Sequence, residues 1–144
     1  MSVQPSVTVR TALIDDVPGC ARLFAAGQQE IEPRIPPWHP DEFLAQTAGE
    51  MILVAAAGRQ VAGFLSLSRH DAFVHFLHVG AAWRRQGIGR KLLASARAEV
   101  ARPLQLKCLV SNRRALAFYH RLGWRPVRSV ADAAAPFIRL GQPS

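Results

Sequence analysis

The sequence predicts one mixed α/β domain with elements in the order β-α-α-β-β-β-α-β-α-β-β. Three observations carry this prediction. The chain has 144 residues, of which 49% are hydrophobic and 19% charged, which is the composition of one ordinary globular domain. Short β-like runs alternate with stretches whose apolar residues recur at helical spacing. No internal repeat or low-complexity tract separates them, so we expect residues 6–142 to form a single domain.

The first elements are a strand, a helix and a loop. Residues 7–13 alternate loosely between apolar and polar side chains and predict a strand. Asp15 or Asp16 caps the helix that follows, with Pro18 in its first turn. Three prolines within residues 27–39 forbid a regular helix there, so a long and shaped loop is expected.

A short helix and a hairpin come next. Pro40 opens the helix and Gly49 ends it. The hairpin has its turn at Gly58 and its strands at residues 51–57 and 60–68.

The second half predicts a strand, a helix, a strand, a helix and a closing pair of strands. The first of these strands is rich in aromatic and β-branched residues. Pro103 ends the first helix, while Asn112 caps the second and Gly123 terminates it. The six elements are expected over residues 71–79, 87–101, 104–110, 113–122, 124–130 and 136–140.

Charge is distributed unevenly along the chain. Residues 1–72 carry five basic and eight acidic side chains, whereas residues 73–144 carry thirteen basic and two acidic ones. The net charge of +8 therefore comes from the second half, which suggests that this half binds an anion. The anion could be nucleic acid or a phosphorylated small molecule. Nearly all the cations are arginine, so a codon bias without functional meaning is an alternative explanation.

Other features of the composition favour a cytoplasmic protein without metal. Cys20 and Cys108 lie far apart in no metal-ligand spacing, which is typical of reduced thiols. No apolar run approaches the roughly 18 residues of a membrane helix. The first ten residues are polar and contain no apolar core of a signal peptide. We therefore expect no membrane association.

The turn between the strand at 71–79 and the next helix has the properties of a phosphate site. Gly87 and Gly89 stand at the helix start, where unpaired N–H groups bind anions and a missing side chain allows close approach. A dinucleotide-binding fingerprint would need glycine in place of Leu92, and a P-loop would need Lys-Ser/Thr after its glycines. Neither pattern fits. Basic side chains surround the turn: Arg84, Arg85, Arg90 and Lys91.

The pattern Arg84-x-x-Gly-x-Gly89 resembles the pyrophosphate-binding signature of the GNAT superfamily of N-acetyltransferases. A second motif of that family, Asn-x-x-Ala-x-x-x-Tyr followed by Gly-Trp, begins at Asn112. The resemblance is specific over residues 72–126 and topological over residues 1–70. It implies the GNAT fold and acetyl-CoA as co-substrate. It also implies direct attack by a primary amine in a ternary complex.

The resemblance implies roles for the backbone and side chains around the two motifs. Backbone amides from Gln86 to Arg90 would cradle the pyrophosphate, and the backbone of residues 77–79 would pair with the pantetheine arm. The Val79 amide would stabilise the oxyanion. Asn112 would lie near the CoA arm, although a helix cap alone also explains it. The cofactor-binding residues expected on this basis are Leu77, His78, Val79, Arg84, Arg85, Gln86, Gly87, Ile88, Gly89, Arg90, Asn112 and Tyr119.

Proton transfer is assigned on the same basis. Tyr119 would protonate the departing thiolate, since a phenol of pKa about 10 keeps its proton at neutral pH. Arylalkylamine-type members place a histidine four residues before the strand-ending Val, here His75, which would be the general base. His78, a water molecule, or a purely structural role for either histidine are the alternatives. Several members carry a Glu where this chain has Lys107, which disfavours acetylation of peptide N-termini.

The loop after residue 27 falls where the family builds its acceptor site. Glu30, Glu32 and Trp38 could hold a cationic and partly apolar amine through charge and cation–π contact, although a merely solvated loop is the alternative. A small-molecule amine is the expected acceptor. The alternatives are a protein N-terminus or lysine, a nucleic-acid-binding module and a CoA-binding domain without catalysis. Exposed strand edges would allow a homodimer.

Overall fold

The computed structural model describes residues 6–31, 33, 39, 41–127 and 136–144. They form a seven-stranded sheet in the order β1-β2-β3-β4-β5-β7-β6. All neighbouring strands are antiparallel except β4 and β5. The strands are β1 (Thr8–Thr11), β2 (Met51–Ala57), β3 (Gln60–Ser68), β4 (Phe73–Val79), β5 (Gln105–Leu109), β6 (Arg125–Pro126) and β7 (Phe137–Gly141).

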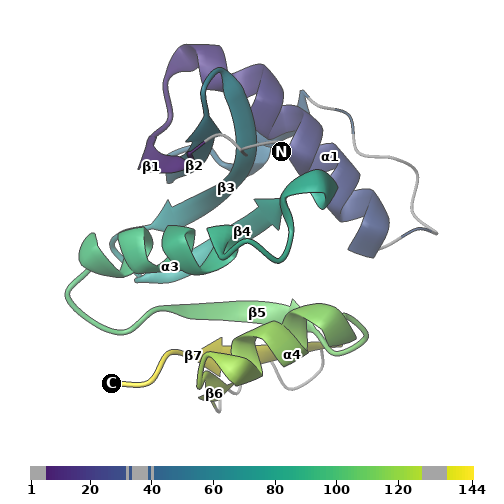
Figure 1. The fold of residues 1–144 in the computed structure, drawn as a ribbon. Helices are drawn as coiled ribbons and strands as arrows, with labels where there is room; N and C mark the ends of the chain where they lie inside the picture. Colours follow the sequence, from purple (N-terminus) through teal and green to yellow (C-terminus); the bar gives the residue numbers. More distant parts are fainter. Residues whose placement is uncertain (1–5, 32, 34–38, 40, 128–135) are drawn as a thin grey trace.

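Four α-helices accompany the sheet in the described residues, and the predicted order of strands and helices is confirmed. Figure 1 shows α1 along the upper half of the sheet, α3 across its middle and α4 below β5. None of these helices is long and apolar enough to cross a bilayer. The helices are α1 (Val17–Ile31), α2 (Glu42–Gln46), α3 (Ile88–Ala98) and α4 (Arg113–Arg121), with 3₁₀ turns at Ile14–Asp16 and Ala81–Trp83.

Alternate residues of the strands supply two cores on opposite faces of the sheet. On one face α1 and α2 cover β2 and β3, with Phe24, Phe43 and Phe64 fully or almost fully buried. On the other face the apolar sides of α3 and α4 share one continuous core, which includes Leu92 and Tyr119. The end of β4, the start of α3, and helices α4 and α1 each lie next to one of these two cores.

The parallel pair β4–β5 is short. Its register covers only Phe73 with Gln105 and Val74 with Leu106, after which the two strands part (Figure 1). The sheet therefore opens between a half made of β1–β4 and a half made of β5, β7 and β6.

A β-bulge lies where β4 leaves β5. Ser66 of β3 pairs with Phe76 and the next residue pairs with Val74, so His75 is the extra residue. Simple alternation would put His75 on the face of Leu77. The bulge instead turns its ring onto the face of α1 and α2, where it stacks on Phe76.

Helix α1 is longer than the sequence indicated. The loop expected from residue 27 starts later, because α1 continues to Ile31. Pro33 follows only two residues after that point, so residues 28–31 can complete the last helical turn before proline geometry interferes.

Asp16 acts one step earlier than the expected cap of α1: its carboxylate closes the 3₁₀ turn that precedes the helix. Its carboxylate accepts the Leu13 amide at 2.7 Å and the Arg10 guanidinium at 2.6 and 3.1 Å. The hydrogen bond from Arg10 lowers the pKa of this nearly buried carboxyl. Strand β1 and helix α1 are therefore tied by one charged group.

Asp16→Asn should destabilise the protein at pH 7 by about 1–3 kcal/mol, since it leaves Arg10 without its anion. The pKa of Asp16 is lowered on folding, so its stabilisation is full above the unfolded-state pKa of about 3.9 and disappears as pH falls through the folded-state value. Urea unfolding at pH 7 and pH 3 measures this. Asp15→Asn, an exposed neighbour, is the matched control and should change little at either pH. Equal effects of the two variants would contradict the assignment.

Candidate active site

A cleft of about 1330 Å³ opens where β4 and β5 part. One wall is formed by the end of β4, the turn after it and the start of α3. The facing wall is α4, and the C-terminal end of α1 closes the third side. The cleft therefore joins segments that lie far apart in the chain.

Gly87 and Gly89, where the chain enters α3, are each favoured for a different structural reason. Gly87 is the N-cap of α3 with φ of +79°, in the left-handed region that disfavours other residues. Gly89 has ordinary helical geometry, but a Cβ there would lie 3.2 Å from Phe118 Cζ of α4. The first helical hydrogen bond runs from Lys91 N to Gly87 O, so the amides of residues 88–90 are free of helical partners.

Eleven of the twelve expected cofactor-binding residues line this cleft. The exception is Gln86, whose side chain is exposed and donates to Ala82 O at 3.4 Å. The backbone of residues 77–79 on the β5 side has no pairing with β5 in the described structure.

Tyr119 comes from α4 and lies against the shared core. Its ring centroid is 5.1 Å from Phe118 and 5.2 Å from Trp124. Burial raises the pKa of its phenol, which keeps the group protonated at neutral pH. Asn112 caps the same helix through its Oδ1, which accepts Ala115 N at 3.4 Å.

Cys108 faces the same core from β5. Burial raises the pKa of its thiol, so the nucleophilic thiolate is disfavoured at neutral pH. Among the described residues, His, Cys, Asp and Glu side chains form no cluster of three that could hold a metal ion.

Glu30 joins the cleft walls from the end of α1. Its carboxylate pairs with Arg84 at 2.7 Å and also with Arg114 of α4. The hydrogen bond from Arg84, and then that from Arg114, lowers the pKa of Glu30. The carboxylate expected to bind an amine is thus engaged by two arginines in this structure. Glu32 and Trp38, the other expected acceptor residues, lie outside the described residues.

His78 lines the cleft, and its ring packs against α1 and three phenylalanine rings. Its Nε2 lies 3.1 Å from Gln28 Oε1, and because an amide oxygen can only accept, Nε2 carries the hydrogen. Its Nδ1 faces α1 so closely that a Cβ on Gly27 would lie 2.1 Å away. Burial lowers the pKa of His78 to about 4. The ring is a neutral packing group that joins α1 to β4.

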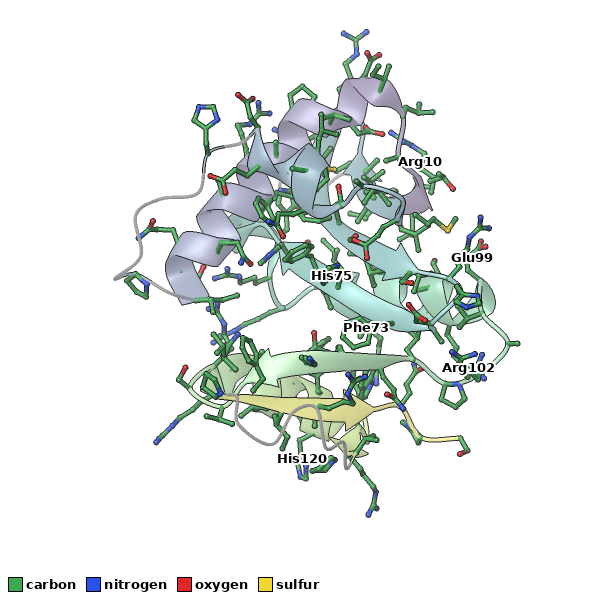
Figure 2. The ribbon with its side chains drawn as sticks, turned by 180° about the vertical axis from the view of Figure 1, so that it is seen from behind. Arg10, Phe73, His75, Glu99, Arg102 and His120 are labelled. Atoms are coloured by element: carbon green, nitrogen blue, oxygen red, sulfur yellow. The ribbon has the colours of Figure 1, made fainter. Side chains whose placement is uncertain are left out.

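His75 has a different environment. It is absent from the cleft walls and lies on the α1–α2 face beside Phe73, as Figure 2 shows. Its side chain is 48% exposed, and its Nδ1 is 2.9 Å from Glu50 Oε2. His75, the expected base, therefore does not line the cleft. It lies on the α1–α2 face of the sheet, at the point where β4 and β5 part.

Sequence reasoning missed several cleft residues. Arg114, Phe118 and Arg121 of α4 lie at spacings of four and three, so a helical projection from Asn112 could have found them. Gly27 carried no such signal, because its role depends on the His78 ring fifty-one residues later in the chain.

Comparison with solved structures identifies the fold. PaiA N-acetyltransferase from Thermoplasma acidophilum, in complex with coenzyme A, superposes with a TM-score of 0.78 at 14% identity, covering 96% of this chain and 99% of that one. An acetyltransferase from Thermus thermophilus gives 0.74 at 18% identity, with 98% and 100% covered. The ribosomal-protein-S18-alanine N-acetyltransferase from Escherichia coli gives 0.67 at 20% identity, with 96% and 94% covered. The fold is that of N-acetyltransferases.

The family follows from the sequence itself. The model of the acetyltransferase (GNAT) family matches residues 17–124, and the chain belongs to this family. The resemblance inferred from the two motifs is thereby confirmed, and the protein is an acetyltransferase. No curated protein sequence matches the chain significantly.

Gly27→Ala should destabilise the protein, although Gly→Ala inside an unobstructed helix stabilises by roughly 0.5–1 kcal/mol. The new methyl group would lie 2.1 Å from His78 Nδ1, and overpacking of this kind costs about 1–3 kcal/mol. Denaturant unfolding measures the change.

The control for this prediction removes the obstacle. In a His78→Ala background the Gly27→Ala substitution should cost nothing or become stabilising, because the imidazole is gone. A Gly27→Ala protein as stable as the wild type would contradict the packing described here.

Proposed function

We propose that this acetyltransferase transfers the acetyl group of acetyl-CoA to a primary amine of a small molecule, by direct attack in a ternary complex. One observation carries the proposal. A single cleft joins a glycine turn with free helix amides, an unpaired strand edge and a buried, protonated tyrosine.

The cleft is suited to an extended anionic cofactor. Its volume of about 1330 Å³ exceeds the 300–1,000 Å³ typical of drug-sized ligands. Free amides at residues 88–90 and the side chains of Arg84, Arg85 and Arg90 would bind the pyrophosphate. The β5-facing edge of residues 77–79 would then hydrogen bond with the pantetheine arm as an added strand would. The similar PaiA structure holds coenzyme A, which supports this assignment.

The proposed reaction needs an oxyanion donor and an acid. The amine nitrogen attacks the thioester carbonyl, and the Val79 amide donates to the oxygen that becomes negative, a contribution of about 3–4 kcal/mol where such donors have been measured. The C–S bond then breaks, and Tyr119 protonates the leaving thiolate and afterwards regains a proton from solvent. The raised pKa of this phenol ensures that the proton is present at pH 7. The buried Cys108 thiol is poorly suited to an acyl-enzyme intermediate, which favours direct attack.

The amine must lose a proton, and we assign this step to His75. Its ring lies where β4 and β5 part, on the face opposite the α3 side, and is half exposed. Glu30, with Glu32 and Trp38, would hold the acceptor, which requires Glu30 to exchange its arginine partners when cofactor phosphates arrive. Lys107, where some relatives carry Glu, supports a small-molecule amine over a peptide N-terminus.

Acetyl-CoA should raise the thermal unfolding midpoint by several degrees. At a hundred times its Kd, a ligand that binds only the folded state adds about 2.7 kcal/mol, which is a shift of several degrees in a domain of this size. Duplex DNA and RNA at low ionic strength are the controls. A shift with nucleic acid but none with acetyl-CoA would overturn the proposal. If acetyl-CoA shifts the midpoint, a panel of small amines and an alanine-terminated peptide should be assayed by thiol release.

Tyr119→Phe should lower kcat roughly 10²- to 10⁴-fold, the usual contribution of a general acid, and leave the KM for acetyl-CoA within a few-fold. The reason is that the phenyl ring keeps the packing against Trp124 and removes only the proton donor. Steady-state thiol release measures both constants. Wild-type kcat in this variant, with an unchanged melting temperature, would mean that another group protonates the thiolate.

A further inference from the structure

Three polar side chains meet on the α1–α2 face of the sheet, at the point where β4 leaves β5. They are Glu50, directly before β2, Ser66 of β3 and His75 of β4. The Glu50 carboxylate accepts Ser66 Oγ at 2.5 Å through Oε1 and lies 2.9 Å from His75 Nδ1 through Oε2. Neither motif of the chain contains Glu50 or Ser66.

The Glu50 carboxylate lies largely out of contact with water, which is unfavourable for a charged group. The Glu50 side chain is only 12% exposed, and Ser66 is fully buried. Removing a carboxylate from water is unfavourable unless hydrogen bonds replace its hydration. In the described structure the two bonds to Ser66 and His75 provide that replacement, one to each oxygen.

Glu50 also fixes the tautomer of His75. An ionised carboxylate can only accept, so Nδ1 of His75 carries the hydrogen and Nε2 is the acceptor nitrogen of the neutral ring. Stacking on Phe76, at 4.8 Å and 16°, fixes the plane of the ring. His78 has the opposite tautomer, with Nε2 bonded and Nδ1 packed on α1. Of the two histidines of β4, His75 alone has its free nitrogen on a half-exposed ring.

We propose that Glu50 is the positioning residue of this acetyltransferase, holding His75 in the tautomer and orientation in which Nε2 takes the proton of the attacking amine. The inference rests on the proposed function, in which His75 is the base. As the N–C bond forms and the C–S bond breaks, the amine proton moves to Nε2. The Glu50 carboxylate then stabilises the imidazolium. His75 afterwards returns the proton from Nε2 to solvent. Ser66 holds the other carboxylate oxygen and keeps Glu50 in place.

Other charges face this region from the second half of the sheet. Arg139 of β7 lies 5.2 Å above the Phe73 ring, which itself touches His75 edge-on. Lys107 of β5 is opposite Arg139 in the strand register and shares its face. Both cations remain in every variant below, so a change in the kcat of a Glu50 variant reports on the carboxylate.

The test compares Glu50→Gln, His75→Gln and the double variant in acetyl transfer to an amine identified in the panel. Glu50→Gln should lower kcat about tenfold or more while leaving the KM for acetyl-CoA unchanged, as part of the 10²- to 10⁴-fold effect of a general base. The acidic limb of the kcat/KM profile is the readout that belongs to the base. His75→Gln should abolish that limb, and adding Glu50→Gln to it should change nothing further.

Two further variants keep the test decisive. Ser66→Ala removes the second bond to Glu50 at a site that tolerates a methyl group, and should lower kcat a few-fold in the same direction. Asp41→Asn breaks the exposed His39–Asp41 pair, 3.3 Å apart, and is the matched control that should leave kcat and the pH profile unchanged.

A readout independent of activity separates this inference from the proposed function. ¹⁵N spectra of labelled histidine should show His75 protonated at Nδ1 in the wild type and a mixture of tautomers in Glu50→Gln. If the wild type transfers acetyl groups but Glu50→Gln has the wild-type kcat, or if its effect multiplies that of His75→Gln, the inference is overturned and the proposed function stands. If the wild type transfers no acetyl group to any amine, the proposed function fails and this inference with it, whichever tautomer is seen.

Discussion

The early end of the β4–β5 pairing is the constraint on which the rest of the structure depends. Two parallel strands joined through a crossover helix could pair along their whole length, yet these two share only two residue pairs. Because they part after Val74, an unpaired edge of β4 faces a cleft between the halves of the sheet. The bulge at His75 stands at the same point and gives the opposite face its own polar cluster. The early end of the β4–β5 pairing thus creates both the cleft and, on the opposite face of the sheet, the polar cluster around His75.

Part of the uneven charge of the chain gathers around this cleft. Most of the excess arginine lies in the second half of the sequence, and Arg84, Arg90 and Arg114 line the cleft from both walls. Glu30, from the acidic first half, pairs with two of them. Such a concentration of positive charge around free helix amides is suited to a polyanionic cofactor. Five of the thirteen basic residues of the second half, Arg84, Arg85, Arg90, Arg114 and Arg121, therefore gather at this one site.

The two histidines of β4 show how far a sequence can be interpreted. Both occur in a β-like run close to a family motif, and the sequence alone does not show which ring is packed against a helix and which is half-exposed. Burial against α1 makes His78 neutral, with a pKa of about 4. A carboxylate from the segment before β2 holds His75 in a defined tautomer. The chemistry of each ring is decided by a partner that is remote in sequence.

The sequence by itself determined the order of elements, the turn at Gly87, the cap at Asn112 and the family, because each depends on residues within a few positions of one another. Only the tertiary structure decided which side chains share an environment. The contacts of His75 with Glu50, His78 with Gln28 and Arg114 with Glu30 span 25, 50 and 84 residues. Local propensities do not encode such distances. These three contacts depend on two tertiary features: the separation of β4 from β5, and the extra turn of α1 beyond the point where the prolines predicted a loop.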